Sequence, residues 1–174
     1  MIVKVSEADD VLSWLEQICS VKKSNIVLIL LIGIAGVGLY WYYRIPPSIN
    51  FKEVEFISLD HKAVPFDSIQ GEKVVLHFYA RWCGPCLREM KDINAEAKNL
   101  SAKGIKIFAI SDDGVGEMKM MASQSSSDIT FLHVKSLEAL GIHSIPTTYL
   151  LRNGETILKQ NGVLNWDKDI FPAK

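Results

Sequence analysis

One apolar run is much longer than any other in the chain and lies near its N-terminus. It covers Ile26–Tyr43, IVLILLIGIAGVGLYWYY, and contains no charged residue over 18 positions. A helix rises about 1.5 Å per residue, so the run would span roughly 27 Å, close to the hydrocarbon core of a bilayer. Lys22 and Lys23 precede it and four aromatic residues crowd its other end, as interfacial anchors do. The pattern predicts a single transmembrane anchor that contacts the lipid bilayer through Ile26–Tyr43.

Two other interpretations of this run stay open. In a cleaved signal peptide, Gly36 and Gly38 would form a small-x-small cleavage site, and a helix buried in a soluble domain would have a similar apolar composition. The long preceding segment, residues 1–25, and the aromatic cluster just beyond Gly38 both favour the uncleaved anchor.

The orientation of the anchor depends on the positive charges on its two sides. Lys22 and Lys23 on one side balance Arg44 and Lys52 on the other, so the positive-inside count is a tie. The adjacent lysine pair favours a cytoplasmic N-terminal segment. A long C-terminal part translocates largely regardless of charge, which permits a domain outside the cytoplasm.

Beyond the anchor the pattern changes to short apolar runs separated by polar segments. Residues 44–50 contain two consecutive prolines and predict a short stiff linker, and residues 51–174 predict one globular domain. The expected strands, in chain order, are Phe56–Leu59, Val64–Phe66, Val74–Ala80, Ile105–Ile110, Ile129–Val134, Thr147–Leu151 and Thr156–Lys159. The expected helices are Leu87–Ser101, Gly116–Ala122 and Ser136–Leu140.

The order of these elements indicates the fold class. Strands alternate with helices, and the dipeptide Asn153-Gly154 predicts a tight hairpin between the last two strands. This order is typical of an α/β domain with a mixed central sheet flanked by helices. A length of 174 residues with 48% hydrophobic residues is enough for about one such domain.

The composition excludes one class of partner. The net charge of −1 provides no electrostatic attraction for nucleic acid. The mean hydropathy of +0.14 is high for a soluble domain, and the apolar run near the N-terminus accounts for it.

The chemistry of the chain is concentrated in the sequence WCGPC, Trp82–Cys86, between a predicted buried strand and a predicted helix. The first N–H groups of a helix are unpaired and favour negative charge, so a thiolate at Cys83 is stabilised there. Cys86 follows one helical turn later, and two thiols so placed can close a local disulfide that is easily opened. Cys19 would lie across the membrane from this pair, which leaves it unable to bond with Cys83.

This region carries a family resemblance. WCGPC, with Ile145-Pro146-Thr147 much later, resembles the thioredoxin superfamily. The stretch FISLDHKAVPFDSIQGEKVVLHFYARWCGPCLREM is similar to the membrane-anchored thiol-disulfide oxidoreductases of the TlpA and ResA type. The resemblance covers the region from Phe51 to Trp166 and implies a thioredoxin-like fold with an N-terminal β-hairpin extension.

The resemblance also implies a mechanism. The Cys83 thiolate attacks a protein disulfide and forms a mixed disulfide, which Cys86 then resolves, so the two form a redox-active disulfide. In the family Pro146 is cis, and the backbone of Ile145 pairs with the extended chain of the substrate. An ordinary turn proline is the alternative for Pro146. The substrate-binding surface would also include three residues of the motif, namely Trp82, Gly84 and Pro85.

Two residues are candidates for the proton that Cys86 must lose. Glu89 matches a glutamate that ResA-like proteins carry beside their cysteines, although it can also be a solvated helix residue. His77 stands where thioredoxin has a buried aspartate, and a histidine near its ordinary pKa of about 6.5 can act as a base at neutral pH. A hydrogen-bonded core histidine is the alternative for His77.

Other functions with related motifs remain alternatives. A thiol oxidase or an isomerase uses the same fold and the same cysteine pair. A copper chaperone of the Sco type would need the spacing CxxxC and a histidine, whereas the spacing here is CxxC. A peroxiredoxin would need threonine at position 80, where this chain has Ala80. We expect no cofactor and no metal site.

The resemblance also implies partners and a location. The Gly-Pro dipeptide between the cysteines accompanies reducing members of the family, which favours reduction of protein disulfides, such as those of cytochrome c maturation. The expected electron donor is a membrane protein of the DsbD or CcdA type, and the expected location is the bacterial inner membrane with the catalytic domain in the periplasm. Because the chain ends soon after Trp166, Asp167–Ile170 would be a stub of the family's final helix, leaving one sheet face partly uncovered.

Overall fold

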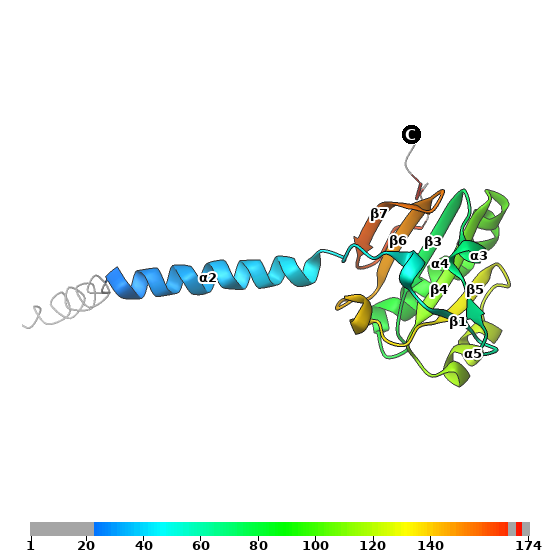
Figure 1. Cartoon of the computed structure of the whole chain (residues 1–174), viewed down its shortest axis with the longest axis horizontal. Helices are drawn as coiled ribbons and strands as arrows, with labels where there is room; N and C mark the ends of the chain where they lie inside the picture. Colours follow the sequence, from blue (N-terminus) through cyan, green and yellow to red (C-terminus); the bar gives the residue numbers. More distant parts are fainter. Residues whose placement is uncertain (1–22, 167–169, 172–174) are drawn as a thin grey trace, which may run out of the picture. The chain divides into compact units, whose positions relative to one another are not determined.

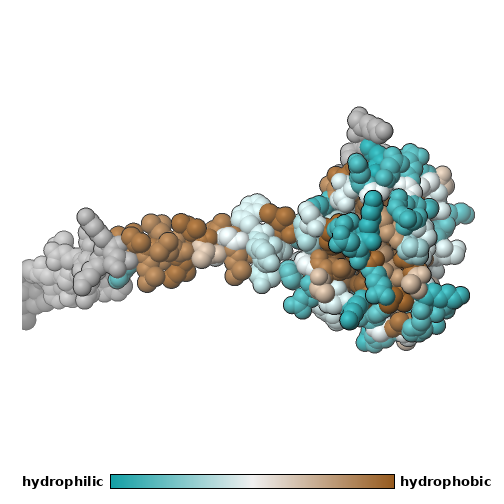
Figure 2. All heavy atoms as spheres, in the orientation of Figure 1, coloured by the Kyte–Doolittle hydropathy of each residue, from teal (hydrophilic) through white to brown (hydrophobic). Residues whose placement is uncertain are grey.

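The computed structural model describes residues 23–166, 170 and 171, and its chain divides into two compact units, Met1–Tyr42 and Tyr43–Lys174. The expected N-terminal segment up to residue 22, with Cys19, lies outside the described residues. Helix α2 (Lys23–Arg44) contains the stretch Asn25–Tyr43, which is long and apolar enough to cross a membrane and has none of its residues buried (Figure 1). Figure 2 shows that the surface of this helix is predominantly apolar. By length and composition the helix fits the expected anchor.

The second unit is built on one mixed sheet of seven strands (Figure 1). The order across the sheet is β2-β1-β5-β4-β3-β6-β7. Strands β3, β4 and β5 are parallel, and the two edges are antiparallel hairpins. The strand bounds are β1 Phe56–Ser58, β2 Ala63–Val64, β3 Lys73–Phe78, β4 Ile105–Ser111, β5 Ile129–His133, β6 Thr147–Arg152 and β7 Glu155–Asn161.

Side chains on the two faces of β3 enter two separate hydrophobic clusters. Val74, Leu76 and Phe78 belong to one cluster, and Val75 belongs to the other together with Tyr79 just beyond the strand. Successive side chains of a strand point to opposite faces, so His77 lies on the same face as Val75 and Tyr79. Both clusters are buried, so β3 is an interior strand with core packing on both faces.

Different helices pack into the two clusters. The cluster with Val75 contains residues of α4 (Gly84–Ala102) and α5 (Val115–Ser123). The cluster on the opposite face contains residues of α3 (Phe66–Ile69) and of the 3₁₀ helix η1 (Phe51–Glu53). A second 3₁₀ helix, η2, covers Glu138–Leu140. The sheet is therefore covered on both faces, as the sequence predicts for a mixed α/β domain.

The sequence predicted most elements correctly. Pairing of Phe56 with Val64 confirms the N-terminal β-hairpin. Asn153 and Gly154 have φ values of +52° and +83°, which is the left-handed backbone that the predicted tight hairpin requires. The helix predicted at Ser136–Leu140 is wrong in type, since only a 3₁₀ turn forms there, and α3 was not predicted. Both segments are too short for apolar residues to recur over several helical turns.

The linker and the C-terminal segment pack closely on the domain. Phe51, at the predicted domain start, is buried and packs edge-on against Tyr149 with ring centroids 5.1 Å apart. The Tyr149 hydroxyl donates a hydrogen bond to the carbonyl of Pro47. At the other end Trp166, Ile170 and Phe171 are all buried in the cluster that contains the α4 residues, so the expectation of an uncovered face is wrong there. Residues 167–169 lie outside the described part of the chain.

Candidate active site

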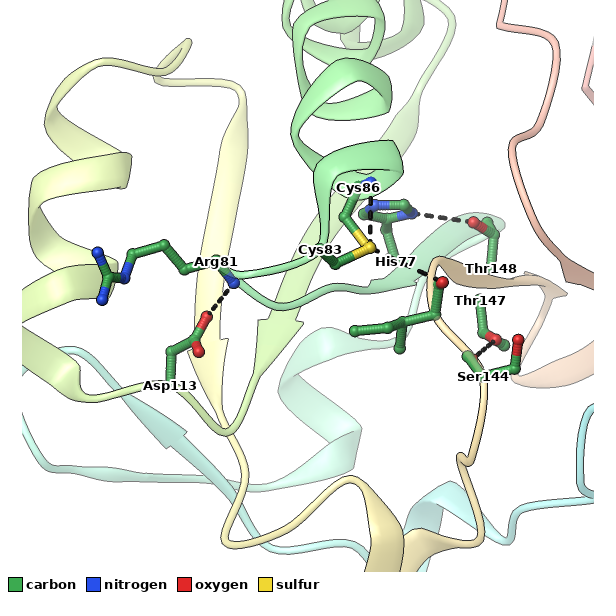
Figure 3. Close-up of a disulfide and its surroundings, with 9 residues drawn as sticks. His77, Arg81, Cys83, Cys86, Asp113, Ser144, Thr147 and Thr148 are labelled. Carbon is green, nitrogen blue, oxygen red and sulfur yellow. Dashed lines mark hydrogen bonds between the residues drawn. A yellow bond between two sulfur atoms is a disulfide. The ribbon is translucent and has the colours of Figure 1, made fainter.

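Cys83 and Cys86 form a disulfide just beyond the carboxyl end of the interior strand β3 (Figure 3). Their Cα atoms are 5.2 Å apart, and both side chains are buried, with Cys83 at 5% exposure. The residues around Cys83 in the motif, Trp82, Gly84 and Pro85, are exposed, with Trp82 at 80%. The sulfur of Cys83 therefore lies just below a surface that Trp82 borders.

The start of α4 holds Cys83 in place. Cys83 is the N-cap residue, with extended backbone, and its Sγ accepts a hydrogen bond from the backbone N–H of Cys86 at 3.2 Å. This N–H is one of the unpaired donors at a helix N-terminus, and in the reduced protein it faces the Cys83 thiolate. The geometry stabilises negative charge on Cys83, as expected from the strand-to-helix position.

The loop before β6 reaches the same sulfur. The peptide bond between Ile145 and Pro146 is cis, and the carbonyl oxygen of Ile145 lies 3.7 Å from Cys83 Sγ. Cys83 carries no proton in the disulfide, so this is a contact, and the reduced thiol can donate a hydrogen bond to the same oxygen. The sequence placed Ile145 beside the reactive sulfur only through the family resemblance, and the structure brings the two together.

A third loop supports the motif from the other side. The backbone N–H of Arg81 donates to Oδ2 of Asp113 at 2.7 Å (Figure 3). The Arg81 guanidinium pairs with Glu117 at 2.6 Å. Asp113 lies in the turn after β4, at the edge of the sheet where ligands bind in open α/β folds. The chain just before Cys83 is therefore held from β4 and α5.

Glu89 is fully buried on α4, one turn beyond Cys86, so a solvated helix residue is the wrong interpretation of it. Its Oε1 accepts from the backbone N–H of Leu164 at 2.8 Å and from the indole N–H of Trp166 at 2.9 Å. Burial raises the pKa of Glu89 and nearby Asp92 adds to the rise, while the two hydrogen bonds oppose it. Residues three apart on a helix lie on one face with Cβ atoms about 5–6 Å apart, so Glu89 and Cys86 are neighbours.

His77 lies on the same face of β3 as Val75 and Tyr79, near the disulfide (Figure 3). Its Nδ1 is 2.9 Å from Oγ1 of Thr148, its partner across the β3–β6 pair, and its Nε2 has no hydrogen-bond partner among the described residues. Burial lowers the pKa of His77 to about 3. The premise that this histidine titrates near its ordinary pKa is therefore wrong, because a charged imidazolium would lose its hydration.

The sequence missed two contributors to the site, Trp166 and Thr148. Trp166 contacts Glu89 through its indole N–H and packs edge-on against His77, with ring centroids 6.2 Å apart. No local motif marks a residue that lies 77 positions beyond its hydrogen-bond partner. Among the described residues, no group of three or more His, Cys, Asp or Glu side chains could hold a metal ion.

Comparison with known proteins assigns the chain to a family. The sequence model of the AhpC/TSA family matches residues 47–168, which is more than half of the chain. The chain belongs to the AhpC/TSA family.

Several individual proteins are similar to this chain. The thiol-disulfide oxidoreductase ResA of Oceanobacillus iheyensis is 34% identical over 131 residues, which span 70% of this chain and 66% of that protein. The thioredoxin-like protein YneN of Bacillus subtilis is 28% identical over 139 residues, spanning 74% of this chain and 81% of that protein. The solved structure of a secreted Mycobacterium tuberculosis disulfide oxidoreductase, homologous to E. coli DsbE, superposes with a TM-score of 0.56 at 21% identity and covers 67% and 90% of the two chains. The expected thioredoxin-like fold and ResA-type resemblance are confirmed.

We predict that His77 makes the domain less stable in acid. The unfolded chain binds a proton at His77 below a pH of about 6.5, whereas the folded chain binds it only near pH 3, so stability falls as the pH falls through this range. Between pH 7 and 5 the full-length chain should lose about 2 kcal/mol that His77→Asn does not lose. Denaturant unfolding in detergent at the two pH values measures the difference. The exposed His61, replaced in His61→Asn, is the control, and equal pH dependence of the unmodified chain and His77→Asn contradicts the prediction.

Proposed function

We propose that this protein is a membrane-anchored reductase that transfers electrons from Cys83 and Cys86 to protein disulfides outside the cytoplasm. The enzyme class is thiol-disulfide oxidoreductase, as in the ResA relatives. The observation that carries the proposal is a disulfide whose Cys83 sulfur lies at a helix N-terminus and beside the backbone of Ile145.

The first step uses the surface around Cys83. In the reduced protein the Cys83 thiolate attacks one sulfur of a substrate disulfide, and the other substrate sulfur leaves as a thiolate with the electron pair. Exposed Trp82, Gly84 and Pro85 border the sulfur, and the Ile145–Pro146 backbone offers a place for an extended substrate segment. The substrate is therefore a protein or peptide with an accessible disulfide.

The second step needs a proton acceptor for buried Cys86. Cys86 must become a thiolate before it attacks Cys83 and releases the reduced substrate. Glu89 is the better candidate, because its raised pKa lies closer to neutrality than that of an ordinary carboxylate. The pKa of neutral His77 is too low for it to take this proton near pH 7. We therefore assign His77 the role of a neutral polar group near the cysteine pair.

The direction of electron flow determines which partner the protein needs. Each cycle leaves Cys83 and Cys86 as a disulfide, so a reductase in an oxidising compartment depends on a dedicated electron donor. A membrane dithiol protein of the DsbD or CcdA type is such a donor, and apocytochrome c is a suitable substrate. If the pair runs in reverse, the protein is a thiol oxidase or an isomerase.

The location follows from α2. Its apolar length fits a single span, and the preceding lysine pair favours a cytoplasmic N-terminus with the domain in the periplasm. The linker after the span, residues 44–50, is short, so the domain would stay tethered to the membrane.

The trapping variant Cys86→Ser tests the reaction. Without Cys86 the mixed disulfide on Cys83 cannot be resolved, so covalent complexes with substrate proteins should accumulate in intact cells. Mass spectrometry of these complexes identifies the partners, and Cys83→Ser is the control that should form none. Cytochrome maturation proteins among the partners support the reductase, while an absence of covalent partners in Cys86→Ser contradicts the enzymatic function.

Glu89→Gln tests the proton acceptor. An amide cannot take the proton of Cys86, so the second step should slow by about 100-fold near pH 7 while attack by Cys83 stays fast. An aromatic disulfide with a coloured thiolate separates the steps, because Cys83 releases the first thiolate and Cys86 the second. Glu96→Gln, at a half-buried position of the same helix, is the control. An unchanged second phase in Glu89→Gln excludes Glu89 as the acceptor.

Thiol labelling tests the topology. In intact cells with the pair reduced, a membrane-impermeant maleimide should label Cys83 but label Cys19 only after the membrane is opened. Cys19→Ser isolates the signal of the pair, and the double variant Cys83→Ser/Cys86→Ser isolates that of Cys19. Labelling of Cys19 from outside would reverse the proposed orientation.

A further inference from the structure

The two oxygens of the Glu89 carboxylate have unequal surroundings. Oε1 accepts both hydrogen bonds, from the amide of Leu164 and from the indole of Trp166. Oε2 is buried and has no hydrogen-bond partner among the described residues. An oxygen with two donors has little capacity left, so Oε2 is the oxygen that can accept a proton.

The segment that contains these two donors, residues 164–166, is held in place by packing against the hydrophobic core. The Trp166 side chain is only 3% exposed and lies in the cluster that contains Cys86 and Met90. Its ring packs against His77 on β3 at an interplanar angle of 82°, and Leu164 packs against the same cluster. Packing therefore holds the two donors in place independently of the charge on Glu89.

We propose that Trp166, together with the backbone amide of Leu164, is a positioning residue that holds Oε1 of Glu89 and leaves Oε2 to take the proton of Cys86. This inference rests on the proposed role of Glu89 as the proton acceptor. The anchored carboxylate keeps one orientation on the face of α4 that it shares with Cys86. The C-terminal segment, far from the motif in sequence, thus becomes part of the machinery of the second step.

In the second step a proton passes from Cys86 to Glu89. The S–H bond of Cys86 breaks, its proton forms an O–H bond with Oε2, and the electron pair stays on sulfur. The Cys86 thiolate then attacks Cys83 and forms the intramolecular disulfide. The bond between Cys83 and the substrate sulfur breaks, and the substrate leaves as a thiolate with that electron pair.

Two other titratable groups near Glu89, His77 and Tyr79, stay neutral through the neutral range. On β3, His77 is neutral because burial lowers its pKa to about 3. Just beyond β3, burial raises the pKa of the Tyr79 phenol, which also stays neutral. On α4, the negative charge of Asp92 acts on Glu89 and raises its pKa. The second step also requires Cys86 to lose its proton, so a fall in its rate at acidic pH, the acid limb, is assigned to Glu89 where Glu89→Gln removes it.

The variant Trp166→Phe tests the proposal in the full-length chain in detergent, with Cys19→Ser as the background. Phenylalanine keeps an aromatic ring in the core but removes the N–H that favours the charged carboxylate. The acid limb of the second coloured-thiolate phase should therefore move up by about one pH unit. Val163→Ala, an exposed change in the same segment, is the control and should leave the limb in place.

The outcomes separate this inference from the proposed function. If the acid limb is lost in Glu89→Gln but stays at the same pH in Trp166→Phe, the positioning role of Trp166 alone is overturned. A limb that persists in Glu89→Gln overturns the assignment of Glu89, and with it this inference. A limb that moves in Val163→Ala as far as in Trp166→Phe also overturns the positioning role, because any disturbance of the segment would then suffice.

A measurement on the unmodified Trp166 covers the case in which Trp166→Phe does not fold. In the reduced chain, with Cys19→Ser as background, the NMR signal of the Trp166 indole N–H should shift with pH, with the same midpoint as the acid limb. The shift should be absent in Glu89→Gln. An indole signal that does not respond to pH through the acid limb overturns the proposal.

Discussion

Strand β3 is hydrogen-bonded on both sides, to β4 in parallel and to β6 antiparallel, and is buried on both faces. This constraint determines where the chemistry occurs. The chain leaves β3 in the interior of the sheet and enters α4 within a few residues, so Cys83 caps a helix at a position where three loops meet. The loops after β3 and β4 and the loop before β6 all end at this edge because their strands pair in fixed register.

The same pairing determines the environment of His77. Its place on β3 buries the imidazole beside the rings of Tyr79 and Trp166, where a charge would lack hydration, and Thr148 on β6 contacts one ring nitrogen. A residue that ionises in water thus becomes a neutral polar group. Glu89 is also buried, but two donors on one oxygen support its charged form, so the carboxylate keeps the capacity to exchange a proton.

Much of the fold could be predicted from local patterns. Strands with continuous apolar runs, the Asn153-Gly154 hairpin and the long helix after the cysteines are local features, and the structure contains all of them. The errors occurred in short segments, at α3 and at Glu138–Leu140, where too few residues show a period. The covered face near Trp166 was also missed, since burial of a single aromatic residue depends on distant partners.

By itself, the sequence determined the chemistry of the reactive sulfurs and the apolar length of α2. A strand, a WCGPC motif and a helix in succession place Cys83 at a helix N-terminus, and this requires only neighbours in the chain. The tertiary structure alone decided the protonation behaviour of the two titratable side chains near the sulfurs, His77 and Glu89. The low pKa of His77 and the one-sided hydrogen bonding of Glu89 come from burial and from Trp166, which contacts them across more than 70 positions of the chain. Desolvation depends on what packs around a group in space, and no local pattern records it.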